Sequence, residues 1–227
     1  MKIQLFRKRL VPVPTVTGLA CLLLIAGSPL FWWCLKGESF LCLTERNPAD
    51  GLVLEGWIGI EGARAAKAEF EQGHYHYIIT AGGPINSRWQ EERWNFATEA
   101  SRMLINLGVP SEKVISAPAT NSGNNRTFES ATFVRLALEK RQLHPASLNI
   151  FTLGAHARRS RLVFAKALPS STQIGIVSWI PPGFLQGPWW KSSERSLDLI
   201  KETVGYLFEL LLNSGRISNA PDGGTGN

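Results

Sequence analysis

A histidine and an arginine stand three residues apart, directly after an apolar stretch that is typical of a buried strand. The stretch is 148–153, and His156 and Arg159 follow it. An imidazole exchanges protons near neutral pH, and a guanidinium pairs with carboxylates or phosphates. On a helix that begins near Ala155, His156 and Arg159 share a face, whereas Arg158 points away into solvent. We therefore predict that His156 is a catalytic acid–base group and that Arg159 binds an anionic substrate. A helix-start histidine beside a solvated basic face fits the same pattern.

Two carboxylates and a threonine near other predicted strand ends extend this candidate site. Glu55 ends the apolar run 51–54, where a carboxylate is costly unless it is paired. We therefore predict that Glu55 either binds substrate or forms a salt bridge to an arginine. Thr127 and Glu129 stand at the start of a helix, where they either line the site or cap the helix. We predict Glu129 as a second catalytic group and Thr127 as a substrate-binding group.

A pair of glycines, Gly82 and Gly83, breaks the chain after the second predicted strand. Glycines at such a corner can bring backbone N–H groups close to a phosphate or carboxylate. The pair matches neither the dinucleotide-binding glycine pattern nor the Walker pattern. We predict that both glycines bind substrate, with a tight turn as the alternative.

The sequence predicts no metal site. His74 and His76 project to one face of a strand, but they lie at its beginning, away from the strand ends, and no third ligand accompanies them. The three cysteines, Cys21, Cys34 and Cys42, have neither zinc nor redox spacing. No motif identifies a cofactor, so the cofactor is unknown at this stage.

Strand-like and helix-like segments alternate five times along residues 50–212. Strands are predicted at 50–55, 75–80, 113–117, 148–153 and 173–179, and helices at 63–72, 96–107, 127–141, 155–168 and 197–211. This alternation predicts an α/β fold, a Rossmann-like three-layer sandwich with a mostly parallel five-stranded sheet. The carboxyl ends of parallel strands share one edge, where ligands bind in such folds. The candidate residues above follow strands and are therefore expected to meet at that edge.

An uncharged apolar segment, 10–35, precedes the predicted domain and is long enough to span a bilayer. Residues 1–36 hold five basic and no acidic residues, which leaves 19 of the 24 basic residues against all 18 acidic ones. The folded part is thus nearly neutral, which argues against a nucleic-acid partner. The positive charges before the apolar segment place the N-terminus in the cytoplasm and the domain outside. We favour an uncleaved transmembrane helix over a signal peptide, because the apolar run is long for the latter.

The predicted organisation has four parts: a cytoplasmic basic tip and anchor at 1–36, a juxtamembrane linker at 37–49, the α/β domain at 50–212 and a disordered tail at 213–227.

The chain resembles the SanA/ElyC/YdcF family, a bacterial family of largely undefined biochemistry. The resemblance spans about 50–211 and rests on short blocks in the family's order, namely Gly51 to Gly83, Glu99-Ala100 with Gly108-Val109-Pro110, Thr127-Phe128-Glu129-Ser130, Thr152 to Arg159, and Glu202 in the last helix. The family's Gly-rich first corner is Glu55-Gly56-Trp57 here, and its Asn after the T-x-E motif is Ser130. The resemblance implies a Rossmann-like fold, frequent membrane anchoring and a link to the cell envelope and peptidoglycan.

Two functions follow as hypotheses. The first is a single-pass protein of the bacterial inner membrane whose extracytoplasmic domain binds or processes an anionic, phosphorylated or lipid-linked envelope precursor, as a hydrolase or transferase. The second is a non-catalytic interaction module, in which a rim with Trp89, Trp189 and Trp190 contacts a membrane-associated partner and the polar corners are structural.

Overall fold

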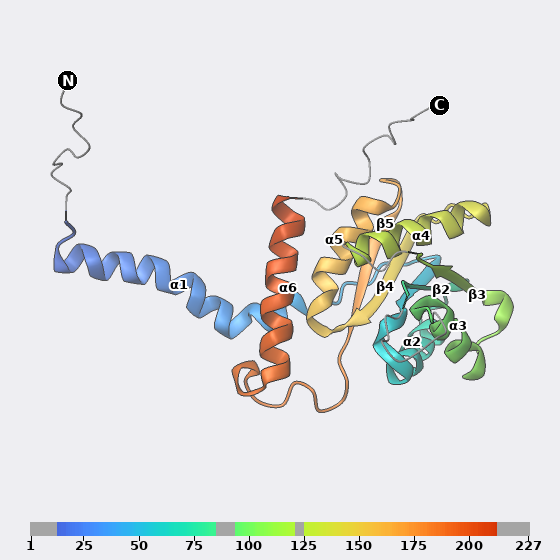
Figure 1. Ribbon diagram of the computed structural model, residues 1–227, viewed down its shortest axis with the longest axis horizontal. Coiled ribbons are helices and arrows are strands. Elements are labelled where there is room, and N and C mark those ends of the chain that lie inside the picture. Colours follow the sequence, from blue (N-terminus) through green and yellow to red (C-terminus); the bar gives the residue numbers. More distant parts are fainter. Residues whose placement is uncertain (1–12, 85–93, 121–124, 213–227) are drawn as a thin grey trace, which may run out of the picture. The chain divides into compact units, whose positions relative to one another are not determined.

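The computed structural model describes residues 13–84, 94–120 and 125–212. Five parallel strands form one sheet in the order β3-β2-β1-β4-β5 (Figure 1). The strands are β1 Gly51–Glu55, β2 Tyr77–Gly82, β3 Val114–Pro118, β4 Ser147–Leu153 and β5 Gln173–Trp179. The predicted α/β fold is confirmed, and every strand pair in the sheet is parallel.

The strand order puts the first and fourth strands of the chain side by side. From β1 the chain builds outward to β2 and β3, and then crosses back to add β4 and β5 on the other side. Val53 of β1 pairs with Ile150 of β4. Such a reversal opens a crevice outside the carboxyl ends of the two strands, which is where open α/β sheets bind ligands.

Helices cover both faces of the sheet. The helices of the domain are α2 Gly59–Gln72, α3 Phe96–Asn106, α4 Arg126–Lys140, α5 Ala157–Ala167 and α6 Ser193–Leu211, and the short 3-10 turns are Gly56–Ile58, Ser111–Lys113, Gly154–His156 and Trp189–Lys191. On one face, α2 and α3 bury Ala66 and Leu104 against Leu52 and Leu54 of β1.

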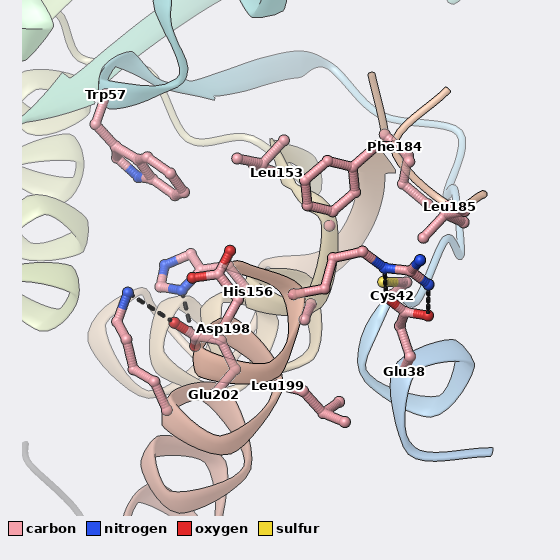
Figure 2. A pocket seen from close by; sticks show the side chains of 15 residues that line it. Glu38, Cys42, Trp57, Leu153, His156, Phe184, Leu185, Asp198, Leu199 and Glu202 are labelled. Carbon is pink, nitrogen blue, oxygen red and sulfur yellow. Dashed lines mark hydrogen bonds and ion pairs between the residues drawn. The ribbon is translucent and has the colours of Figure 1, made fainter. Parts of the chain in front are cut away.

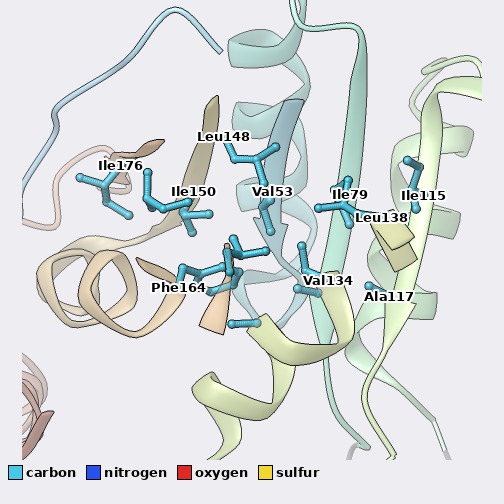
Figure 3. Packing of buried hydrophobic residues seen from close by; sticks show 14 of the residues in the cluster. Val53, Ile79, Ile115, Ala117, Val134, Leu138, Leu148, Ile150, Phe164 and Ile176 are labelled. Carbon is cyan, nitrogen blue, oxygen red and sulfur yellow. The ribbon is translucent and has the colours of Figure 1, made fainter. Parts of the chain in front are cut away.

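The opposite face carries the second core cluster, in which Val134 and Leu138 of α4 and Phe164 of α5 pack on the sheet (Figure 3). Phe164 and Val134 are fully buried. These two layers of side chains produce the three-layer sandwich that the alternation predicts.

The helix α1, Val16–Leu41, is long and apolar enough to cross a membrane by length and composition. This agrees with the predicted span at 10–35, of which residues 10–12 lie outside the described residues. The chain divides into two units, Met1–Gly37 and Glu38–Asn227. The basic tip before residue 13 and the predicted tail, 213–227, also lie outside the described residues.

The predicted linker, 37–49, contributes to the α/β unit over most of its length. Leu41 is fully buried, and Glu45 exchanges both backbone hydrogen bonds with Ile176 of β5. Asn149 of β4 donates to the Asn47 carbonyl and accepts from the Asn47 N–H. The chain after Gly37 is therefore held on the edge of the sheet.

The last helix, α6, directs its apolar stripe away from the protein. The helix predicted at 197–211 is present with an apolar stripe, but Leu197, Val204 and Leu211 of that stripe are 62–70% exposed. The buried side of the helix holds Leu199 together with the charged residues Arg195, Glu202 and Glu209.

Candidate functional site

A glutamate and a histidine meet at the crevice between β1 and β4. Glu55 is the last residue of β1, and His156 ends the 3-10 turn that follows β4. Because these strands are neighbours, the His156 Nε2 atom lies 3.4 Å from Glu55 Oε2. Both side chains are buried. Glu55 thus finds the partner that its burial requires, although that partner is a histidine and not the arginine of the predicted alternative.

Two buried hydroxyls complete the environment of Glu55. Thr152 Oγ1, on β4, and Ser160 Oγ, in the first turn of α5, both donate to Glu55 Oε2. Burial raises the pKa of Glu55, but the charge of His156 and the hydrogen bonds from His156, Thr152 and Ser160 outweigh it and lower that pKa. Glu55 is therefore a carboxylate at neutral pH.

A second carboxylate, Glu202 of α6, binds the other nitrogen of the imidazole. His156 Nδ1 lies 3.0 Å from Glu202 Oε2, and Arg159 Nε donates to the same oxygen at 2.7 Å. Arg159 Nη2 donates to Glu202 Oε1 at 3.2 Å, and Lys201 Nζ is 3.4 Å from that oxygen. Burial raises the pKa of Glu202, but its contacts with His156 and Arg159 lower it well below the ordinary range.

The imidazole of His156 is held between these two carboxylates. Burial alone lowers the pKa of His156, but the charges of Glu55 and Glu202 and their hydrogen bonds raise it to about 8. In the protonated form Nε2 faces Glu55 and Nδ1 donates to Glu202. In the neutral form Nδ1 can instead accept from Arg159 Nη2, which lies 2.9 Å away. Nδ1 therefore has a partner in both protonation states, as an acid–base group requires.

Trp57 packs against the imidazole from the turn after β1. Its ring meets that of His156 edge to face, with centroids 5.3 Å apart and an interplanar angle of 88°. This contact excludes water from one side of the histidine while leaving its nitrogens to the carboxylates.

A cavity of about 580 Å³ lies beside this cluster. Its lining includes Glu55, Trp57, His156 and Arg159, and its other charged residues are Arg126, Lys201 and Glu209. A cavity of this size accommodates a small-molecule ligand. A smaller space of about 60 Å³ adjoins His156, Trp57 and Glu202 on the side of the Arg195–Glu38 ion pair (Figure 2).

The cavity also borders groups that suit an anion. Gly82 and Gly83 line it, as do residues 125–128 at the beginning of α4. Asn125, the residue before α4, has a left-handed backbone and makes no side-chain capping bond. The first turn of a helix presents N–H groups and the positive end of the helix dipole. Together with the exposed Arg126, this end of the cavity is electropositive.

Six of the seven predicted site residues meet at this cavity: Glu55, Gly82, Gly83, Thr127, His156 and Arg159. Arg159 Nη1 approaches Thr127 Oγ1 at 3.4 Å. Thr127 lies inside α4 and is not its N-cap residue. Gly82 also has a packing role, because a Cβ atom there would stand 2.7 Å from Cβ of Phe96.

Glu129 is the one of the seven predicted residues that the cavity lining does not include. It is half-buried in the first turn of α4. The carboxylates beside the imidazole are Glu55 and Glu202. The catalytic role predicted for Glu129 stays a prediction, without support from the geometry.

The prediction that Arg158 points into solvent is wrong. Its Nε donates to the Phe40 carbonyl at 2.6 Å, and its guanidinium carbon lies 3.8 Å from the centroid of the Phe40 ring. Helical spacing correctly separates Arg158 from His156 and Arg159. It carries no information on the segment around residue 40, which covers the other side of α5.

Sequence reasoning missed the roles of Glu202, Thr152, Ser160 and Lys201. A signal for Glu202 exists, because Arg195, Glu202 and Glu209 recur every seven residues on one side of α6. Charged residues at that interval, on the side opposite an apolar stripe, are ordinarily solvent-exposed. Only the packing of α6 reveals that they face inward.

No protein-family model and no curated protein sequence matches this chain.

Proposed function

We propose that this protein is anchored in the bacterial inner membrane and that its extracytoplasmic domain binds and processes an anionic, phosphorylated precursor of the cell envelope. The observation that carries the proposal is the buried Glu55–His156–Glu202 cluster beside a cavity of about 580 Å³. The resemblance to the SanA/ElyC/YdcF family and the topology expected from the charges support the envelope and the location outside the cytoplasm.

The charges around the cavity favour an anionic ligand. Protonated His156, Arg126, Arg159 and Lys201 provide four positive charges on its lining, against two negative charges from Glu55 and Glu209. Glu209 is paired with Lys166 at 3.3 Å, so its charge is offset locally. Arg126 and Lys201 are exposed and can approach a phosphate as it enters.

Within this site the residues take distinct roles. Backbone N–H groups of Gly82, Gly83 and the first turn of α4 bind the anion, and Arg126 pairs with it. His156 supplies a proton to the departing oxygen of the ligand or removes one from the attacking group. Glu55 and Glu202 stabilise the imidazolium, and Arg159 positions Glu202 through its two hydrogen bonds.

Binding by the full chain in detergent micelles tests the proposal, with a polyprenyl diphosphate and a nucleotide diphosphate sugar as probes. We expect at least one probe to bind and Arg126→Ala to weaken binding by about tenfold, which corresponds to about 1.4 kcal/mol. Arg135→Ala is the matched control, since Arg135 lies on the same helix and pairs with Glu139 at 2.9 Å. Unchanged affinity in Arg126→Ala, or no binding of either probe, would overturn the proposal.

Turnover is measured separately by release of phosphate or of the leaving alcohol from the bound probe. His156→Gln should abolish release and leave affinity within a few fold, because the glutamine removes the titrating group and keeps a polar side chain. Binding without release by the unmodified protein would assign the site to binding alone.

A further inference from the structure

The outer face of α6 is an apolar surface of the α/β unit. Outside α1, the exposed large apolar side chains of α2, α3 and α4 occur singly. On α6, Leu197, Ile200, Val204, Leu207 and Leu211 share one side of the helix, whereas exposed Leu210 lies on another side and Phe208 borders the cavity. Water-exposed apolar patches of this extent mark contacts with another molecule or a membrane.

The orientation of α6 makes this face a fixed feature of the fold. On its inner side, Arg195 binds Glu38, Glu202 binds His156 and Arg159, and Lys166 contacts Glu209. These buried charge pairs hold the helix in one rotation about its axis, since turning it would leave each charge buried without its partner. Its apolar residues therefore stay outward.

Composition and the expected topology argue against the parts of the chain outside the described residues as the cover of this face. The tail 213–227 has Ile217 as its single large apolar residue, and the segment 85–93 has Ile85 and Trp89 among polar and charged neighbours. The first residues, before 13, hold four Lys and Arg among five large apolar residues besides Met1, and the positive-inside rule predicts that they lie across the membrane from the α/β unit. The cover must come from elsewhere.

A lipid surface is the cover that the chain itself brings close. The apolar segment expected to span the membrane ends at Leu35, and the α/β unit begins at Glu38. Glu38 is bound directly by Arg195, near the start of α6. Only Lys36 and Gly37 separate Leu35 from Glu38. Since each residue spans at most about 3.6 Å, Glu38 stays within roughly 11 Å of the end of the apolar segment. Exposed Trp190 and Leu185 precede α6 in the chain and suit the interfacial zone, where tryptophan is enriched.

We propose that α6 is an interfacial helix whose outer face lies in the headgroup region of the membrane. The side chains of Leu197, Ile200, Val204 and Leu211 enter the apolar boundary, while the charged inner side remains in the protein. Ordinary interfacial helices present their polar side to water. Here the protein takes the place of water on that side.

The test uses the full chain in vesicles of phosphatidylcholine and phosphatidylglycerol, with all three cysteines first replaced by alanine. Val204→Cys is labelled with a small fluorophore, and lipids carrying a spin-label quencher on the acyl chain are added. Glu112→Cys, at an exposed position before the far edge strand β3, is the control. We expect several-fold stronger quenching at position 204 than at position 112.

Equal and weak quenching at both positions would overturn the proposal. Oxidation of unlabelled Val204→Cys provides a further outcome, because a disulfide-linked dimer without lipid quenching would identify a second copy of the chain as the cover. Leu197→Cys repeats the measurement about two helical turns away on the same side of α6. A local defect at position 204 therefore cannot decide the result.

Discussion

At the scale of single residues, His156 is the centre of the site because each of its nitrogens faces a carboxylate. A buried imidazole without partners would be neutral at physiological pH. Glu55 at 3.4 Å and Glu202 at 3.0 Å reverse that tendency and raise its pKa to about 8. The site therefore holds a proton at neutral pH that it can release over a small pH interval.

This raised pKa has a consequence for stability. His156 binds its proton more tightly in the folded state than in the unfolded chain, whose histidine pKa is about 6.5. The contribution of His156 to the free energy of unfolding is therefore fully present below about pH 6.5 and is lost as the pH rises through about 8. His156→Gln should therefore lower the free energy of unfolding by about 2 kcal/mol more at roughly pH 6 than at roughly pH 9. Urea unfolding of the full chain in micelles measures this difference.

The exposed His144 provides the control for that measurement. His144→Gln removes an exposed side chain and should change the stability by less than about 0.5 kcal/mol. Parallel stability curves for His156→Gln and the unmodified protein would show that folding does not shift the pKa of His156.

At the scale of elements, α6 inserts charges into the site while it presents apolar residues to the outside. Its close approach to α5 depends on a glycine. A Cβ atom on Gly205 would lie 2.8 Å from Cδ and 2.9 Å from Nε of Arg159. At this position the backbone of α6 can approach Arg159 because it carries no side chain there.

Gly205→Ala should displace Arg159 from Glu202 and destabilise the protein by about 1–3 kcal/mol, the usual range for an overpacked position. In an Arg159→Ala background the same change should instead be neutral or stabilising by up to about 1 kcal/mol, because alanine is the better helix former. Unfolding of the four proteins of this cycle measures the coupling. If the free-energy changes of Gly205→Ala and Arg159→Ala simply add in the double variant, the close contact between Gly205 and Arg159 is contradicted.

The beginning of α6 is held by one buried ion pair. Arg195 donates to both carboxylate oxygens of Glu38 and, through Nη1, to the carbonyls of Gln186 and Gly187. It thereby joins three separate segments of the chain.

Arg195→Ala should destabilise the protein by about 3–5 kcal/mol, since it leaves a largely buried carboxylate and two carbonyls without this donor. Arg102→Ala should cost less than about 1 kcal/mol, because Arg102 is exposed and pairs with Glu99 across one helical turn. Thermal or urea unfolding compares the two variants. A cost for Arg195→Ala as small as that for Arg102→Ala would show that the pair does not hold the segments together.

At the scale of the whole molecule, the charge is distributed unevenly. Five of the six net positive charges lie in residues 1–36, and the folded part is nearly neutral. The positive-inside rule then predicts an N-terminus in the cytoplasm and an α/β unit on the other side of the membrane.

A reporter at the C-terminus tests this orientation. A phosphatase that is active only outside the cytoplasm should be active when fused after Asn227, and a fluorescent protein that matures only in the cytoplasm should stay dark. Replacing Arg7, Lys8 and Arg9 by glutamate should reduce the phosphatase signal, since the orientation depends on these charges. The opposite pair of signals would place the domain in the cytoplasm.

The sequence alone determined the features that depend on local order and periodicity. Alternating strand and helix segments predicted the parallel sheet, the apolar run predicted α1, and i, i+3 spacing placed His156 and Arg159 on one face. These inferences succeed because backbone geometry converts spacing along the chain directly into direction in space.

Only the tertiary structure decided which distant residues join that face. The strand order made β1 and β4 neighbours and thus brought Glu55 to His156, and the rotation of α6 brought Glu202 to the imidazole and turned Val204 outward. Periodicity shows that a helix has two unlike sides but not which side the rest of the protein will cover. That choice depends on the pairing of buried charges between segments far apart in the sequence.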